Sequence, residues 1–208
     1  MGTALLEEAP ELVSRLVIID QAPDGSFGES NLLLELSLTP VLGETAWRLA
    51  PDWSIEDGLS KGFAPGYDVP EAFVDDFRRL TFSAYDDSAE AEISYSDARP
   101  LDQRIAASGV PLLVIFGAEE QLYDPEPSLR AYAEGVPGAK THLVTGAGHS
   151  PNVERPALTA ALVLRSLEAS DEDARGSKKG RPVGRPRVKE EPAATYSPRR
   201  LPSKYHRR

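Results

Sequence analysis

The 208 residues include no cysteine, which excludes disulfide bridges and thiolate metal sites in this chain. Long apolar runs are also missing, because none approaches the roughly 20 residues that span a bilayer. No basic segment followed by an apolar one opens the chain, as a secretory signal would. The sequence therefore predicts a soluble, cytoplasmic protein without a membrane contact.

Charge is divided unevenly along the chain, which carries a net charge of -10. Residues 174–208 hold 12 Lys and Arg against 2 Asp and Glu, whereas the preceding residues hold 11 against 31. Such a contrast indicates an acidic globular body joined to a basic tail. We predict a domain over residues 1–168 and a disordered, Pro- and Arg-rich tail over residues 169–208, because the tail has few apolar residues and high charge.

Three short apolar runs have the composition of strands buried in a parallel sheet: 16–20, 110–116 and 141–144. The second leads into Gly117-Ala118-Glu119-Glu120, and the third leads into Gly146-Ala147-Gly148-His149-Ser150-Pro151. Helical patterns surround these runs at residues 1–8, 72–80, 128–133 and 157–167.

A strand ending in Gly and an acid, followed by a strand ending in Gly-x-Gly-His, resembles the C-terminal half of the α/β-hydrolases. The resemblance implies an α/β fold, with parallel strands, flanking helices and a helical lid. It also implies that His149 is the general base and that Glu120, three residues after Gly117, orients its ring. Asp is the usual residue at the acid position, so Glu is a departure with a longer arm, and Asp124 is the reserve candidate.

The nucleophile of this family lies on a tight turn, Gly-x-Ser-x-Gly, between a strand and a helix. Met1-Gly2 resemble the last two residues of that turn, which would place the nucleophile immediately before Met1. We therefore expect the nucleophile and the first five strands to be missing, and the chain to be inactive and poorly stable by itself. The resemblance implies an oxyanion-hole amide at Met1 and a Ser nucleophile, with Asp as the alternative. The competing interpretation is that residues 1–9 form an ordinary amphipathic helix at a true start.

One internal segment, Gly58-Leu59-Ser60-Lys61-Gly62, also fits Gly-x-Ser-x-Gly. The turn requires a buried strand before the Ser and a helix after it. Here residues 51–57 are charged, and Pro65-Gly66 would stop a following helix. We therefore do not expect Ser60 to be the nucleophile.

Residues 30–108 lack strand periodicity and, by the resemblance, form the lid that shapes the substrate pocket. The implied substrate is a small apolar molecule with an ester, amide, lactone or similar bond. The lid's aromatic residues either line an apolar pocket or pack the lid onto the rest of the domain; they are Trp47, Trp53, Phe63, Tyr67 and Phe82. His142 and His206 have no companion at metal-ligand spacing, so we expect neither a metal nor another cofactor.

The tail supports an alternative function, that of a non-catalytic DNA-associated protein. Its two Gly-Arg-Pro units, at Arg181 and Arg185, resemble the AT-hook, whose arginines enter the minor groove of A·T-rich DNA. Lys179 and Val183 stand where the hook's core has Arg, so a solvated basic tail with weak nucleic-acid contact is the other interpretation. An A·T-dependent affinity that disappears when Arg181 and Arg185 become Ala would identify a hook. Equal, salt-sensitive binding of all duplexes would identify plain electrostatics.

Overall fold

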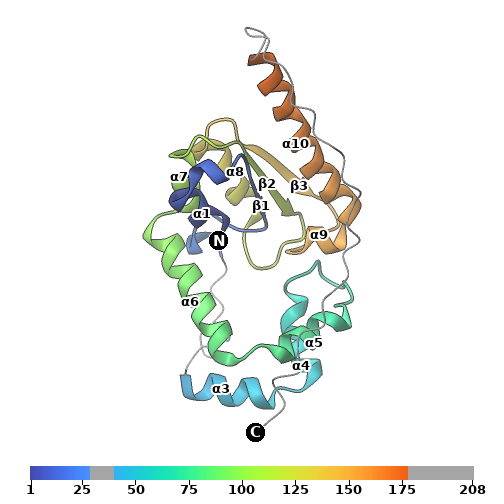
Figure 1. Cartoon of the computed structure of the whole chain (residues 1–208). Coiled ribbons are helices and arrows are strands. Elements are labelled where there is room, and N and C mark those ends of the chain that lie inside the picture. The colour runs from blue at the N-terminus through green and yellow to red at the C-terminus, as the bar shows by residue number, and fades with distance from the viewer. Residues whose placement is uncertain (29–39, 178–208) are drawn as a thin grey trace, which may run out of the picture. The chain divides into compact units, whose positions relative to one another are not determined.

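The computed structural model of the chain describes residues 1–28 and 40–177, and its centre is a parallel sheet (Figure 1). Strand β1 (Leu16–Ile19) pairs with β2 (Leu112–Gly117), which pairs with β3 (Lys140–Val144). The register aligns Leu16 with Leu112 and Lys140 with Leu113. All three strand predictions are confirmed.

Strand β2 is buried along its whole length, as its uninterrupted apolar run indicates. One face of the sheet packs on α1 (Gly2–Glu8), α7 (Leu101–Ala106) and α8 (Pro125–Gly135), which contribute Leu6, Ile105 and Tyr132 to the core. The opposite face carries Leu113 and Ile115, with Leu162 and Val163 of α10 (Pro156–Ser177) packed against them. Helices therefore cover both faces, so the expected α/β class is confirmed.

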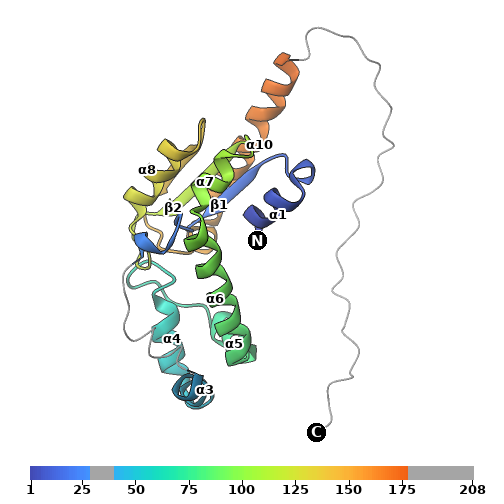
Figure 2. The same cartoon turned by 90° about the vertical axis from the view of Figure 1, so that its left-hand side faces the viewer.

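The segment between β1 and β2 holds the helical insert, defined here as α3 (Pro40–Leu49), α4 (Asp52–Ser60), α5 (Glu71–Arg79) and α6 (Phe82–Ala98). In both ribbon views α3, α4 and α5 lie away from the strands, and α6 leads back toward them (Figures 1 and 2). The described part of the predicted lid is thus helical. The apolar run Leu32–Leu36 lies outside the described residues.

Short elements complete the described chain: η1 (Pro10–Leu12), η2 (Gly25–Phe27) and α9 (Pro151–Glu154). Helix α10 corrects one expectation, because residues 169–177 continue the helix that was predicted to end near residue 167. The segment after Leu167 is rich in helix-compatible residues, with no Pro or Gly before Gly176. Residues 1–170 form one compact unit. Across the described ranges, no helix is both long and apolar enough to cross a membrane.

Candidate functional site

The loops that follow β2 and β3 leave the sheet at the same edge, because the two parallel strands end side by side at Gly117 and Val144. Two backbone hydrogen bonds extend this pairing into the loops. The N–H of Ala118 donates to Val144 O at 2.9 Å, and the N–H of Glu119 donates to Ala147 O at 2.9 Å. The carboxyl edge of a parallel sheet, where such loops meet, is where ligands bind in open α/β folds.

His149 and Glu120 meet at this edge. Nδ1 of His149 lies 2.7 Å from Oε2 of Glu120. The other oxygen, Oε1, accepts hydrogen bonds from the N–H groups of Gln121 at 2.8 Å and Leu122 at 2.7 Å. The Glu120 side chain is fully buried, whereas 29% of the His149 side chain is exposed. A fixed carboxylate therefore holds one nitrogen of a ring that solvent can reach, which leaves Nε2 available to a reactant.

The charge of Glu120 is stabilised by these contacts. Burial raises the pKa of its carboxyl, but the hydrogen bond and charge of His149, with the Leu122 N–H, outweigh burial and hold the pKa below its usual range. Glu120 is consequently a carboxylate at neutral pH. An anion at Nδ1 favours the tautomer with its proton on Nδ1, and it stabilises the imidazolium that forms when Nε2 accepts a proton.

Asp20, at the end of β1, is a second acid at the same edge. It is 2% exposed and has a φ of 46°, which is uncommon for a residue other than Gly. Its Oδ1 accepts from the Gly117 N–H at 2.8 Å, whereas Oδ2 has no hydrogen-bond partner in the described structure. Burial, with the nearby charge of Glu120, raises the pKa of Asp20 to about 8. Burial therefore favours the neutral form of the Asp20 carboxyl.

Asp20, Glu120 and His149 each offer one polar atom, and these atoms all lie within 4.8 Å of one another. Two carboxylates and an imidazole are chemically able to bind a cation. Here, however, Nδ1 of His149 and both carboxylate oxygens of Glu120 are already engaged in the hydrogen bonds described above. A cation would have to replace the His149–Glu120 hydrogen bond, so the donor set fits a shared proton better than a metal.

Backbone contact holds the histidine loop on the acid loop. A Cβ atom on Gly117 would lie 2.1 Å from Gly148 O, so only Gly permits this approach without a shift. The Glu119 carboxylate accepts from the N–H groups of Gly146 at 3.0 Å and Ala147 at 2.8 Å. The residue next to Glu120 thus fixes the loop that carries His149.

Other residues singled out in the sequence lie elsewhere. Asp124 is exposed at the N-terminus of α8, and within the described residues no hydrogen bond or ion pair joins it to His149. Its N–H donates to Phe27 O at 2.9 Å. Ser60 ends helix α4, so no buried strand precedes it, and its Oγ donates to Asp57 O at 2.6 Å.

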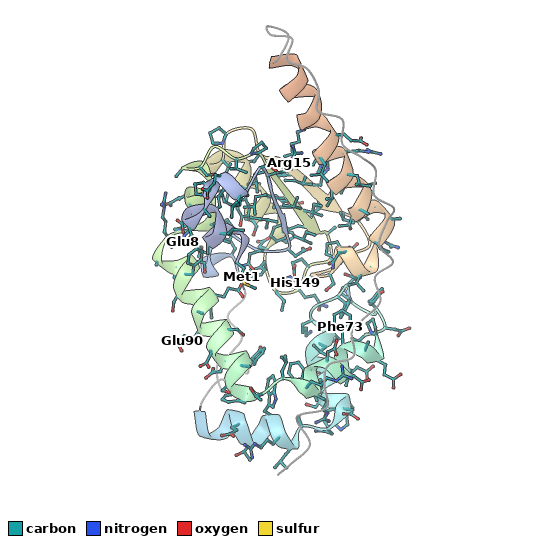
Figure 3. All side chains as sticks on the ribbon, in the orientation of Figure 1. Met1, Glu8, Arg15, Phe73, Glu90 and His149 are labelled. Carbon is teal, nitrogen blue, oxygen red and sulfur yellow. The ribbon has the colours of Figure 1, made fainter. Side chains whose placement is uncertain are left out.

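Met1 is exposed and precedes α1, and its carbonyl accepts from the Leu5 N–H at 3.0 Å. Figure 3 shows Met1 and His149 on the side of the sheet that faces the helical insert. The oxyanion role of Met1 requires a peptide N–H at that residue and stays a prediction. Arg181 and Arg185 lie outside the described residues, so DNA contact also stays a prediction.

Sequence analysis did not single out Asp20, Glu119 or Glu154. Asp20 had a usable signal, because it follows a predicted strand whose parallel neighbour ends at the site. Glu119 and Glu154 had none, because both act on backbone N–H groups that only the folded loops bring near.

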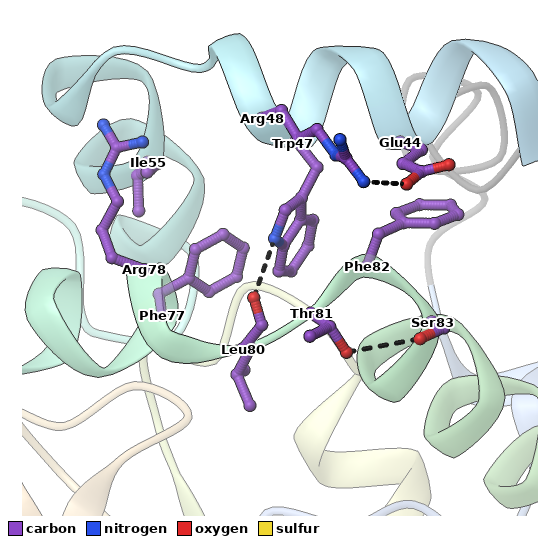
Figure 4. Close-up of a pocket in the computed structure, with 10 residues that line it drawn as sticks. All are labelled: Glu44, Trp47, Arg48, Ile55, Phe77, Arg78, Leu80, Thr81, Phe82 and Ser83. Carbon is purple, nitrogen blue, oxygen red and sulfur yellow. Dashed lines mark hydrogen bonds and ion pairs between the residues drawn. The ribbon is translucent and has the colours of Figure 1, made fainter. Parts of the chain in front are cut away.

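A cavity of about 500 Å³ lies within the helical insert (Figure 4). Trp47, Phe77 and Phe82 line it, and the Phe77 ring is tilted against that of Trp47, with 4.3 Å between the ring centroids. Neither His149 nor Glu120 lines this cavity. The other lid aromatics differ: Trp53 is 72% exposed, and Phe63 is buried against Tyr67.

A second cavity, of about 630 Å³, adjoins the acid loop and is lined by Gln121, Tyr123 and Asp124 on one side and Ser26, Phe27 and Gly28 on the other. The Tyr123 ring lies 5.9 Å from that of His149, measured between centroids. Of the two cavities, this one is nearer to the His149–Glu120 pair.

Known proteins share this architecture. The enol-lactonase from Burkholderia xenovorans LB400 superposes with a TM-score of 0.62 and 21% identity, over 80% of this chain and 61% of that one. A thermophilic esterase from Thermogutta terrifontis superposes with a TM-score of 0.56 and 19% identity, over 81% and 60%. An uncharacterised carboxylesterase, nap, of Bacillus subtilis (strain 168) is 29% identical over 68 residues, which are 33% of this chain and 23% of that protein.

The chain thus spans about three fifths of the length of these solved structures. At such identities, the superpositions establish the fold alone. A model of the alpha/beta hydrolase family matches residues 1–162, from the helix before β1 through the loop that carries His149 and into α10. With more than three quarters of its length matched in this way, the chain belongs to the alpha/beta hydrolase family.

Proposed function

We propose that these residues form the histidine- and acid-bearing part of a hydrolase that cleaves an ester, lactone or similar acyl bond in a small apolar substrate. The observation that carries the proposal is the 2.7 Å contact between His149 Nδ1 and Glu120 Oε2, with Glu120 fixed by two backbone N–H groups. A base aligned in this way by a buried anion is the arrangement that activates a hydroxyl nucleophile.

In the proposed reaction, Nε2 of His149 takes the proton of a Ser hydroxyl as its oxygen attacks the substrate carbonyl. The imidazolium then gives that proton to the departing alcohol, which leaves an acyl-enzyme. Water attacks the acyl group with the same base, releasing the acid and restoring Ser. Met1-Gly2 resemble the end of the Gly-x-Ser-x-Gly turn, so in this proposal the Met1 N–H lies in the oxyanion hole beside that Ser.

Asp20 shapes the electrostatics of this reaction. Because burial raises its pKa to about 8, Asp20 favours its neutral form at physiological pH, so Glu120 is the anion of this pair that contacts the His149 ring. Two adjacent carboxylates would repel each other in this buried setting. The neutral Asp20 thus leaves one negative charge to stabilise one imidazolium.

The substrate class is supported by chemistry and by likeness. The cavity beside the acid loop is lined by Phe27 and Tyr123, and the Tyr123 ring lies 5.9 Å from that of His149, so apolar surface borders the proposed base. Proteins of similar fold are described as an enol-lactonase and an esterase. A carboxylic ester or lactone with a small apolar acyl part fits both observations.

The test begins with the protein as its native cells make it. Peptides of this native form should read Gly-x-Ser into Met1-Gly2, as the motif assignment requires. The native form should hydrolyse p-nitrophenyl acetate or a simple γ-lactone. In the native form, His149→Gln should lower kcat by about 10³-fold or more.

His142→Gln is the matched control, because His142 is exposed on β3 and remote from Glu120 in the register. It should leave kcat unchanged. Loss of activity in both variants, or in neither, would contradict the role of His149.

A further inference from the structure

A short turn of the helical insert, residues 60–64, contacts the loop that carries Glu120. The Nε2 group of Gln121 donates to Phe63 O at 2.8 Å and to Ser60 O at 3.3 Å. Lys61 Nζ approaches Gln121 Oε1 at 3.5 Å. Because Gln121 directly follows Glu120, this side chain connects the insert to the acid of the site.

The same turn is joined to the loop that carries His149. The Glu154 carboxylate accepts from the Ala64 N–H through Oε1 at 2.7 Å and from the Gly148 N–H through Oε2 at 2.8 Å. Glu154 is 7% exposed at the end of α9. Gly148 directly precedes His149, so one buried carboxylate bridges the insert and the base of the site.

The bridge lies where two backbones touch. A Cβ atom on Gly148 would lie 2.3 Å from the carbonyl carbon of Phe63 and 2.4 Å from the Ala64 nitrogen. Phe63 is 1% exposed, and its ring stacks on Tyr67 and meets Phe73 edge-on. The turn is therefore seated in the protein by packing as well as by hydrogen bonds.

We infer that Glu154 and Gln121 form a clamp through which the seating of the insert sets the alignment of His149 with Glu120. Glu154 is a positioning residue, because it contacts the backbone beside His149 rather than the reacting atoms. A carboxylate suits this position because both of its oxygens accept hydrogen bonds, one from each N–H group. An amide in its place would offer one acceptor and would turn an N–H₂ donor toward the second N–H group.

The clamp links insert movement to the site. Lifting the turn breaks the bonds to Ala64 N and Phe63 O together, which frees the loop segments on either side of the His149–Glu120 pair. Seating the turn restores them. The catalytic meaning of this coupling rests on the proposed function, but the coupling itself is a property of the folded chain and is measurable without substrate.

Amide hydrogen exchange and the His149 Nδ1–H resonance, both observed by NMR, test the clamp. In Glu154→Gln we expect the Ala64 or Gly148 amide to exchange at least about tenfold faster, because one of them loses its acceptor. We also expect the Nδ1–H resonance to shift or broaden as the His149–Glu120 hydrogen bond loosens. Unchanged exchange and an unchanged resonance in the folded variant would overturn the inference.

Glu119→Gln is the matched control, because Glu119 binds Gly146 and Ala147 in the same loop but no residue of the turn. It should leave Ala64 exchange unchanged, and equal acceleration in both variants would overturn the clamp.

Should Glu154→Gln fail to fold, Gln121→Ala provides the second test. Gln121 is partly exposed, so this variant should fold, and it removes the hydrogen bond to the Phe63 carbonyl. Faster Ala64 exchange supports the clamp, and unchanged exchange refutes it. Ester hydrolysis tests the proposed function separately.

Discussion

The edge of the sheet and the helical insert are held in different ways. At the edge, acidic side chains bind backbone N–H groups: Asp20 holds Gly117, Glu119 holds Gly146 and Ala147, Glu120 holds Gln121 and Leu122, and Glu154 holds Ala64 and Gly148. Within the insert, aromatic rings pack around Trp47, and exposed ion pairs such as Arg78–Asp52 join the helices.

The difference has consequences for how each region responds to change. Hydrogen bonds to buried, charged acceptors fix main-chain atoms in place, and losing one leaves a buried group unsatisfied. Aromatic packing and exposed ion pairs fix helices less strictly, because side chains repack and solvent screens the charges. We therefore expect substitutions at the edge to be far more damaging than comparable substitutions in the insert.

Substituting one glycine in each region tests this comparison directly, and the substitution at the edge should have the largest effect on stability. Gly117→Ala places a Cβ atom against Gly148 O and should lower the free energy of unfolding by about 3 kcal/mol, as overpacking does. Gly58→Ala, in helix α4 with nothing within 4 Å of the new Cβ, should raise it by up to about 1 kcal/mol. Urea denaturation measures both. Similar changes in the two variants would break the comparison.

The proton on Asp20 should give an effect of intermediate size that depends on pH. Its folded pKa, about 8, lies above its ordinary value of 3.8, so the folded state retains a proton that the unfolded chain releases. The stabilisation from Asp20 is complete below pH 3.8 and is lost as the pH rises toward 8. Glu120, whose pKa is lowered, acts in the opposite sense and only as the pH falls below its usual range.

Asp20→Asn, which is uncharged at every pH, should remove the Asp20 contribution. Urea denaturation at several pH values from 5 to 8 should show the wild type losing stability relative to the variant as the pH rises. A stability difference that does not vary with pH would show that Asp20 is not protonated in the folded protein.

The smallest effect is expected from an ion pair in the insert. Arg78 donates to Asp52 from an exposed position, with 37% and 76% of the two side chains exposed. Arg78→Ala should cost less than about 1 kcal/mol, and less still in 1 M salt, because solvent and ions screen such pairs. Urea denaturation at two salt concentrations measures this. A larger cost, insensitive to salt, would show that the insert is held as strictly as the edge.

Sequence patterns predicted the elements of the edge but only part of its chemistry. The apolar run from Leu112 to Phe116 predicts a buried strand, and in the structure this strand, β2, is buried between two others. The structure also places Glu120 and His149, the two residues named from the turn motifs, within hydrogen-bonding distance. The role of each in catalysis stays a prediction. Asp124, the reserve acid, instead begins helix α8, where its carboxyl is exposed.

The remaining contacts had no local signature. Glu154 and Ala64 are 90 residues apart, and their bond depends on how the insert folds back, which periodicity does not encode. The extent of α10 was underestimated for the opposite reason. Charged residues after Leu167 indicate solvent exposure, but an exposed helix has the same composition as a solvated tail over so short a stretch.

The carboxylate anchors also bear on how such a site diverges. They bind main-chain atoms, so the exposed side chain at Leu122 and the partly exposed one at Ala64 can change without loss of the anchoring bonds. The positions that the anchors leave unconstrained can therefore change while the main chain of both loops keeps its course. The anchoring carboxylates and the glycines between them set the geometry of the two loops, whereas the exposed side chains along them do not.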